Sequence, residues 1–351
     1  MEDPGVHPWA EWQRRGVTRS ALRQGLRNGR FTQVNHGWYA VGGAEPDAVE
    51  AVRRGGALSC LPALARHNVW IPPHHQKLHV RGGHRAHAAR PGRFCRQFSR
   101  PEPVLAAIDD PLTALRHALR CLDPEGITVV CDSLLNTSLR AMSGEPIAEI
   151  LTPTEVESAF QGAPGYIRRA LDLCDARAAS GTETMVRLRL RSKRVKVDLQ
   201  VEIPEVGHVD LLAGDRLIIE ADSLTYHLGP AEFRTDRHRD QQAARQGLLH
   251  MRLTYEDVVY DWQRTEEIIL SAIRSGADSV TTAADDIASG NQDLSQRTEV
   301  QAGSIEETTS AMKALTGTVK ANADHARQAE ELAASACSVA SEGGAVVSQV
   351  V

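Results

Sequence analysis

The chain has 351 residues, a formal net charge of −5 and 42% hydrophobic residues. This length exceeds that of one ordinary domain and predicts two or three domains. The sequence has no signal peptide and no run of about 18 apolar residues, so we expect neither export nor a membrane span.

The distribution of charge indicates a type of binding partner, and the cysteine positions exclude some kinds of site. Residues 1–100 hold 16 Lys and Arg against 6 Asp and Glu, whereas residues 277–351 hold 4 against 11. The basic end favours a polyanion such as DNA as its partner. The six cysteines lack a C-x-x-C spacing, and the histidines between positions 67 and 87 match no metal-binding template. The cysteines therefore indicate neither a zinc ribbon nor a disulfide framework, and reduced thiols in the cytoplasm are the simplest account.

The first 50 residues have the pattern of a winged-helix DNA-binding domain. A turn and N-cap at 16–20 precede a predicted helix at 21–28, and a strand pair follows through residues 34–41. The alternative is a small scaffold helix whose arginines are solvated. In the DNA-binding interpretation, phosphates are contacted by Arg19, Arg23, Arg27 and Arg30.

This segment resembles the N-terminal domain of AbiEi-type antitoxins. The matching residues are Gly16, Arg19, Leu22, Gly29, Val34, Gly37 and Tyr39. The resemblance implies that the arginines and the tip of the strand pair contact DNA.

Residues 51–174 carry a weaker pattern. Helices are predicted at 110–122, 127–138 and 153–160. We interpret this part as a mixed α/β connecting domain.

Residues 175–275 place acidic residues inside otherwise apolar strands. Buried carboxylates are costly unless they are paired or bind a cation. A three-residue loop at 214–216 predicts a hairpin whose register sets Asp210 opposite Glu220, with Asp222 two residues along on the same face. We therefore expect these three carboxylates to share Mg²⁺ or Mn²⁺.

The predicted order in this part is helix, three strands, helix, strand and helix, which is an α/β sandwich. The pattern resembles the very-short-patch-repair-like branch of the PD-(D/E)xK nuclease superfamily over about residues 175–275. The matching motifs are Thr182-Glu183, Val209-Asp210-Leu211, Ile219-Glu220-Ala221-Asp222-Ser223, His227, Asp236-Arg237-His238-Arg239-Asp240 and Arg252-Leu253.

The resemblance implies metal-dependent cleavage of a phosphodiester. Asp210 and Glu220 would hold the metal, and Glu183 would complete or orient the site. His227 would act as an acid, a base or a phosphate contact. The other implied site residues are the catalytic carboxylate Asp222 and the DNA clamps Arg237 and Arg239.

The sequence differs from the family pattern at two positions, and some of the predicted site residues also have a simpler explanation. Asp222 stands where the superfamily usually has a lysine, so the positive charge must come from elsewhere. Ser223 replaces a glycine, which weakens the expected close approach of backbone and substrate. Asp222 alone is equally typical of an edge residue facing water. Arg237 and Arg239 fit a solvated helix face at least as well as a DNA contact.

The sequence changes character after Ser275, beyond which it has no Phe, Trp, Tyr or Pro. Ile305, Met312 and Val319 recur at seven-residue spacing, with Leu315 between them. This spacing predicts one long coiled-coil helix through which the chain would form a homodimer.

Residues 277–351 closely resemble the first methylation helix of methyl-accepting chemotaxis receptors. The resemblance is carried by residues 288–299, 304–308 and 343–347. In that family, paired Glu and Gln sites recur every seven residues, and here only Glu307 matches a methyl-accepting site. We interpret the segment as a fused receptor fragment or as a natural linker helix that drives dimerisation.

The sequence therefore predicts an α+β multidomain protein. Its favoured function is a Mg-dependent DNA endonuclease guided by a winged-helix reader. The alternatives are a non-catalytic, antitoxin-like DNA-binding regulator and a truncated methyl-accepting chemotaxis signalling fragment. The predicted parts are a winged-helix domain (1–50), a connecting domain (51–174), a restriction-endonuclease-like α/β nuclease domain (175–275) and a receptor-like long α-helix (276–351).

Overall fold

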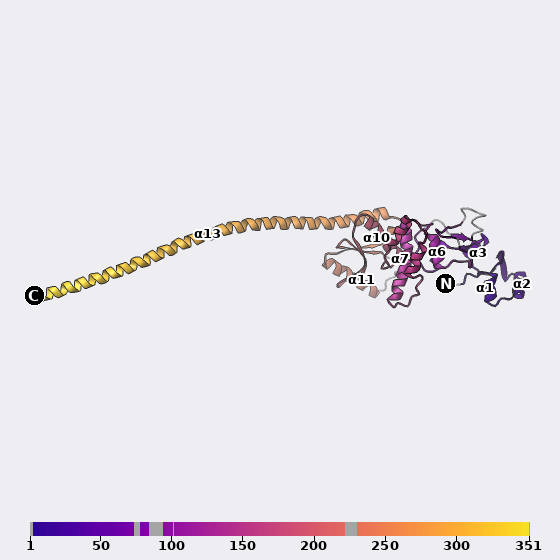
Figure 1. The fold of residues 1–351 in the computed structure, drawn as a ribbon, viewed down its shortest axis with the longest axis horizontal. Coiled ribbons are helices and arrows are strands. Elements are labelled where there is room, and N and C mark those ends of the chain that lie inside the picture. The colour runs from indigo at the N-terminus through magenta and orange to yellow at the C-terminus, as the bar shows by residue number, and fades with distance from the viewer. Residues whose placement is uncertain (1–2, 74–77, 84–93, 101, 222–229, 351) are drawn as a thin grey trace. The chain divides into compact units, whose positions relative to one another are not determined.

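The computed structural model describes residues 3–73, 78–83, 94–100, 102–221 and 230–350, without the side chains of 230–236, 276–280 and 349–350. Contacts divide the chain into two units, Met1–Gly276 and Ala277–Val351. The first unit combines helices with small sheets, and a long helix forms the second (Figure 1). This architecture confirms the predicted α+β class, while the finer domain assignments stay predictions.

A three-stranded antiparallel sheet and two helices form the N-terminal part. The strand order is β1-β3-β2. The Thr18 side chain caps α2 by accepting a hydrogen bond from the Ala21 N–H, as the turn pattern predicts. Leu22 of α2 is buried with Trp12 and Phe31 in a small apolar cluster. The elements are β1 (Val6–Pro8), α1 (Trp9–Arg14), α2 (Arg19–Arg27), β2 (Phe31–Asn35) and β3 (Trp38–Val41).

The middle of the chain is mainly helical and forms the largest apolar core of the first unit. Asp110 and Asp123 cap the N-termini of α6 and α7, each followed by a proline at the first helical position. A two-stranded antiparallel pair, β4 with β5, lies beside these helices. The elements are α3 (Pro46–Arg53), β4 (Gly56–Leu58), α4 (Cys60–Ala65), β5 (Val80–Gly82), α6 (Pro111–Ala118), α7 (Pro124–Met142), α8 (Pro153–Ala159) and α9 (Gly165–Asp172).

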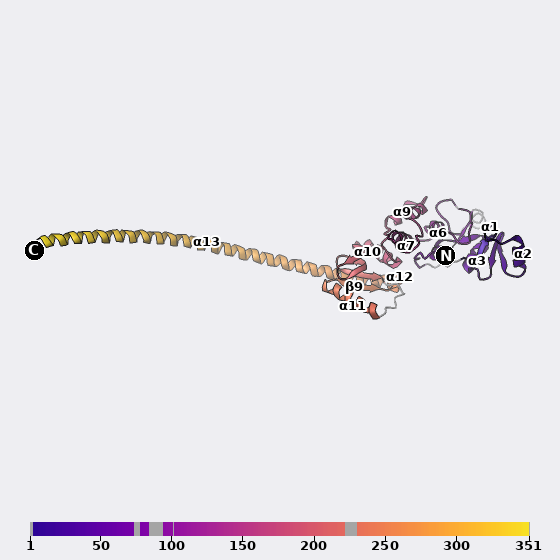
Figure 2. The ribbon, with the colours of Figure 1, turned by 90° about the horizontal axis from the view of Figure 1, so that it is seen from below.

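Residues 181–259 contain a four-stranded sheet in the order β6-β7-β8-β9. Its last strand, β9, and the helices α10, α11 and α12 of this part are labelled in Figure 2. Neighbouring strands are antiparallel except β8 and β9, which are parallel because α11 connects them. Helix, three strands, helix, strand and helix follow one another as predicted. The elements are α10 (Gly181–Ser192), β6 (Val197–Ile203), β7 (Gly207–Ala213), β8 (Leu217–Ala221), α11 (Pro230–Arg245), β9 (Leu249–Leu253) and α12 (Tyr255–Val259).

The sheet has apolar residues on both faces. Along β6 and β7, the regular alternation of side chains between the two faces breaks at one point. Leu199 and Leu211 pack in the core that includes α10 residues. Val201 and Val209, the next pair in register, pack instead with Ala243 of α11 on the other side. Gln200 lies between these two pairs with φ of +49°. Asp210 lies between Val209 and Leu211, which pack in these two different apolar clusters.

A buried ion pair joins α7 to α10. The Arg187 Nη2 donates to Asp132 Oδ2 at 2.7 Å, and the two side chains are 1% and 0% exposed. Thr184 Oγ1 and the Asp175 N–H also donate to the Asp132 carboxylate. Arg187 Nη1 donates to the Leu173 carbonyl oxygen at 2.8 Å. Burial raises the pKa of Asp132 despite the adjacent guanidinium. Because both charges are buried, each depends on the other for compensation.

The last helix, α13 (Trp262–Val350), begins in the first unit, where Thr265 and Ile269 are buried. Within the second unit, the predicted helix is present and its apolar side chains are exposed. Ile305, Met312 and Val319 are 59–63% exposed. Dimerisation through this seven-residue spacing stays a prediction. No helix in the described ranges is apolar enough over sufficient length to cross a bilayer.

Candidate functional site

Glu183 is a buried carboxylate in the first turn of α10. Ser180 caps this helix by accepting the Glu183 N–H at 3.2 Å. The Glu183 Oε2 accepts hydrogen bonds from the Ala179 N–H at 2.9 Å and Gln200 Nε2 at 3.1 Å. Burial, and secondly the negative charge of Asp210, raise the pKa of Glu183 to about 7. Glu183 is therefore an acidic group that titrates near neutral pH.

Close backbone packing fixes the start of α10. A Cβ atom on Gly181 would lie 2.1 Å from the Trp70 ring, so only glycine allows this approach. The indole thus lies against the helix start two residues before Glu183. This contact limits residue 181 to glycine at the first position of α10.

Asp210 lies near Glu183, on the strand that the hairpin prediction identified. The register of β7 and β8 pairs Ala213 with Leu217, which confirms the predicted three-residue loop. The pairing runs as far as Leu211 with Ile219, and the predicted pair of Asp210 and Glu220 lies one step beyond it. The Asp210 Oδ2 accepts a hydrogen bond from the Ala221 N–H at 3.1 Å. Two acidic side chains from different elements therefore lie close enough for the charge of one to act on the other.

Glu220 has three cationic neighbours that the sequence interpretation did not identify. Arg239 Nη2, His250 Nε2 and Arg252 Nε each lie 3.3 Å from a Glu220 carboxylate oxygen. The pKa of Glu220 is lowered by the His250 hydrogen bond and further by the charges of the two arginines. The parallel pairing of β8 with β9 sets Arg252 beside Glu220. The three basic side chains near Glu220 thus come from α11 and β9.

The shared cation of Asp210 and Glu220 stays a prediction. In the parts of the chain that the structure describes, acidic residues form no group of three or more ligand atoms within 4.8 Å. Asp222 and His227 lie outside the described residues. The structure therefore brings Glu183 and Asp210 together, and it places Glu220 among arginine and histidine side chains.

Arg239 and Arg237 differ in their surroundings. Arg239 donates from Nε to the Val206 carbonyl oxygen at 2.8 Å, and its Nη2 contacts the His208 carbonyl oxygen. These bonds attach α11 to the start of β7, so Arg239 has a structural role in addition to any phosphate contact. Arg237 is exposed.

The arginines of α2 form an exposed basic surface. Arg19, Arg23 and Arg27 recur every four residues and therefore lie on one helix face, while Arg30 lies in the turn before β2. Within the described ranges, none of the four forms a salt bridge. Arg14 and Arg15 of the same region, in contrast, are both paired with Glu11.

A second group of chemically active side chains was missed by the sequence analysis. Cys60, His79, Cys95 and Cys121 place their ligand atoms within 4.8 Å of one another and could hold a metal ion. Burial raises the pKa of the Cys60 thiol, and hydrogen bonding to Cys121 raises the pKa of Cys95 to about 12. The cysteine spacing indicated no zinc ribbon, and the structure adds four side chains that could hold a metal ion although they form no such motif. The four residues are far apart in sequence, so the short spacings typical of zinc motifs are absent.

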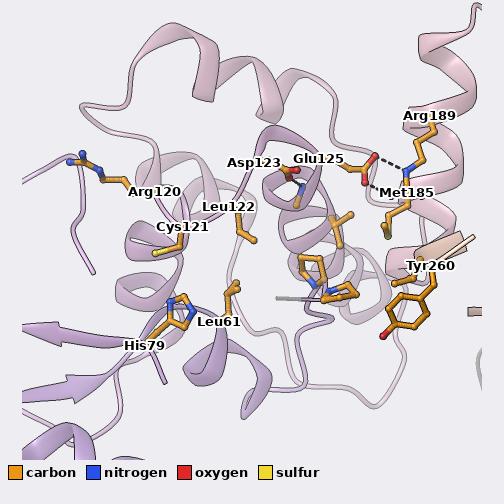
Figure 3. Close-up of a pocket in the computed structure, with 15 residues that line it drawn as sticks. Leu61, His79, Arg120, Cys121, Leu122, Asp123, Glu125, Met185, Arg189 and Tyr260 are labelled. Carbon is orange, nitrogen blue, oxygen red and sulfur yellow. Dashed lines mark hydrogen bonds and ion pairs between the residues drawn. The ribbon is translucent and has the colours of Figure 1, made fainter. Parts of the chain in front are cut away.

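A pocket of about 700 Å³ adjoins this group (Figure 3). His79 and Cys121 line one end, and Met185 and Tyr260 line another part of the wall. The ion pair between Arg189 and Glu125, at 2.7 Å, fixes α10 against the start of α7 within the wall. The pocket gives solvent a route to Cys121.

No family model, curated protein or solved structure matches the chain. The three family resemblances therefore stay predictions. The methyl-accepting role of Glu307, which is exposed on α13, also stays a prediction. Function is inferred below from the geometry of the described residues.

Proposed function

We propose that the protein is a DNA-binding, metal-dependent endonuclease whose reactive centre includes Glu183 and Asp210. The observation that supports this function is the pairing of a buried glutamate with a neighbouring aspartate. Burial and the Asp210 charge raise the pKa of Glu183 to about 7. A pair of carboxylates with such a perturbed pKa is typical of a functional site.

The donor atoms of this pair fit a divalent cation. Carboxylate oxygens are the ligands that Mg²⁺ and Mn²⁺ prefer, and a cation would relieve the repulsion between Glu183 and Asp210. Bound there, it would lower the pKa of a water ligand and stabilise charge on a phosphate. Asp222 follows β8 directly and remains a predicted third carboxylate.

The cationic group around Glu220 fits the charge of a DNA backbone. The side chains of Arg239 and Arg252 are 29% and 36% exposed, so they are partly open to solvent. Hydrogen bonding to Glu220 raises the pKa of His250, which favours its protonated, cationic form. We propose that these side chains bind a phosphate beside the carboxylate pair.

The first prediction concerns DNA nicking by the full-length chain. With supercoiled plasmid and Mg²⁺ or Mn²⁺, we expect the native protein to produce open circles. Asp210→Asn should lower the nicking rate at least about 100-fold, because it removes a metal-ligand charge and its effect on Glu183. Gel quantification of the open-circle band measures this rate.

The matched control for this experiment is Glu202→Gln. Glu202 is an exposed acid in β6 of the same sheet, so its loss should leave nicking unchanged. Equal rates for Asp210→Asn and the native chain would contradict the proposed centre. Circular dichroism of both variants checks that the fold is retained.

The second prediction concerns the α2 arginines, which we propose bind DNA phosphates. Arg23→Ala with Arg27→Ala should weaken DNA binding and reduce the slope of log affinity against log salt by about 2, because two phosphate contacts are lost. Fluorescence anisotropy with a labelled duplex at several salt concentrations measures this slope. The control pair Arg53→Ala with Arg54→Ala also removes two arginines, both already paired with Glu50. An unchanged slope in the α2 variant would remove this helix from the DNA-binding surface.

The second candidate function is a DNA-binding regulator without catalysis. The observation that favours it is the engagement of Glu220 by three cationic side chains, which leaves this carboxylate less available to a metal. Salt-sensitive DNA binding without nicking in either Mg²⁺ or Mn²⁺ would favour this alternative over the endonuclease.

A further inference from the structure

The first unit brings Cys60, His79, Cys95 and Cys121 together from four separate segments of the chain. Cys60 begins α4 just after β4, and His79 directly precedes β5. Cys95 lies alongside β5, where its N–H donates to the Val80 carbonyl oxygen at 2.8 Å. Cys121 follows α6. The paired strands β4 and β5 therefore position three of the four side chains.

Two of the distances between the ligand atoms are close to the edges of a coordination tetrahedron, and all four atoms lie within 4.8 Å of one another. Zinc binds sulfur at about 2.3 Å and imidazole nitrogen at about 2.0–2.1 Å, which sets two sulfur ligands about 3.8 Å apart and a sulfur and a nitrogen about 3.6 Å apart. The Cys121 and Cys95 sulfurs are 3.7 Å apart, and Cys95 Sγ lies 3.4 Å from His79 Nδ1. A disulfide would require sulfurs about 2.05 Å apart, so these thiols are separate.

The surroundings hold the group rigidly. Cys60 is fully buried, and His79 is 5% exposed. Cys60 has φ of +57°, a left-handed conformation that is unfavourable for a residue with a Cβ atom and persists only where the surrounding structure fixes it. Arg81 in β5, two residues after His79, forms two 2.7 Å hydrogen bonds with Asp109, and this pair anchors the strand.

We propose that Cys60, His79, Cys95 and Cys121 form a structural zinc site. Three thiolates and one imidazole are a common structural zinc ligand set, and four protein ligands leave no open position for a catalytic water. Each thiol that binds zinc releases its proton to solvent. The soft sulfur ligands disfavour Mg²⁺, so this site is distinct from the proposed Glu183 and Asp210 centre.

The site has a specific structural consequence. It would tie α4, β5 and the end of α6 to the segment around Cys95, and Cys121 at the pocket wall provides a route for metal entry. Zinc bound to the folded state alone would stabilise this part of the chain. Loss of zinc should therefore lower stability without any change at the carboxylate pair.

The test is metal analysis of the full-length chain purified without chelator. We expect about one zinc ion per chain by elemental analysis and by native mass spectrometry. Replacement by Co²⁺ should give thiolate-to-cobalt charge-transfer absorption and the intense d–d bands of a tetrahedral site. A chelator should lower the melting temperature of the zinc-loaded chain.

Cys121→Ser and Cys174→Ser form the matched pair of variants. Cys121 is exposed, so its replacement by serine should preserve packing, but we expect at least a tenfold loss of zinc affinity and an altered cobalt spectrum. Cys174 is a partly buried cysteine outside the group, and its variant should retain one zinc ion. Cys95→Ser should behave like Cys121→Ser.

Two results would overturn the proposal. One is a folded native chain with no bound zinc and no tetrahedral cobalt spectrum after incubation with either metal under reducing conditions. The other is equal zinc affinity in the native chain and in both Cys95→Ser and Cys121→Ser. DNA nicking is not used as a readout, so failure of the endonuclease proposal leaves this test intact.

Discussion

Arg187→Met should lower the free energy of unfolding of the first unit by about 3–5 kcal/mol. The substitution leaves Asp132, whose side chain is fully buried, without its cationic partner. The Leu173 carbonyl oxygen also loses the Arg187 hydrogen bond. Urea titration followed by tryptophan fluorescence measures this change.

Arg177→Met is the control for this experiment. Arg177 also pairs with an aspartate, Asp175, but its side chain is 51% exposed, so its loss should cost less than about 1 kcal/mol. Adding Asp132→Asn to Arg187→Met should recover part of the loss, because a neutral amide needs no counter-charge. Equal stabilities for Arg187→Met and Arg177→Met would show that the buried pair contributes little.

Glu183→Gln should remove a pH dependence of stability. The pKa of Glu183 is about 7 in the folded chain and about 4.5 as its reference value, so the folded state holds the proton more tightly. Stability of the native chain should therefore decrease as pH rises from about 4.5 to about 7 and then level off. The glutamine variant lacks this ionisation and should gain up to about 3 kcal/mol relative to the native chain across that range.

Urea titrations at pH 5, 6, 7 and 8 in the presence of EDTA measure this difference. Glu202→Gln should give the same profile as the native chain, because Glu202 is exposed. If cation binding at the carboxylate pair is correct, Mg²⁺ should flatten the native profile and leave that of Glu183→Gln unchanged. If stability changed with pH in the same way in the native protein and in Glu183→Gln, Glu183 would not be a buried acid with a raised pKa.

The local elements of the nuclease-like part were predictable because their determinants are local. The three-residue loop at 214–216 sets the hairpin register, as expected, and Ser180 caps α10 three residues before Glu183. The sequence did not predict that β9 pairs with β8. Which strand becomes the parallel neighbour of β8 depends on how α11 crosses the sheet. His250 and Arg252 of β9 were for that reason not identified as neighbours of Glu220, whereas Arg239 of α11 had been predicted as a DNA clamp.

The other features that the sequence did not predict also depend on tertiary structure. Sequence periodicity did not distinguish Arg187, which is fully buried, from Arg189 on the same helix, which is partly exposed. The alternation rule did not anticipate the left-handed backbone at Gln200, where β6 and β7 change face. Cys60 and Cys121 meet through tertiary packing alone, so no local spacing indicated their proximity.

The distribution of tryptophan gives the two units separate spectroscopic reporters. All five indoles precede residue 263, so intrinsic fluorescence follows the first unit alone. The second unit consists of one helix with exposed side chains and contributes strongly to far-ultraviolet ellipticity. A solvent-exposed helix without tertiary packing melts gradually, whereas a packed core melts cooperatively. On heating, the melting curves from ellipticity and from tryptophan fluorescence should therefore not coincide. The ellipticity should fall gradually over a wide temperature range, and the fluorescence should change sharply within that range.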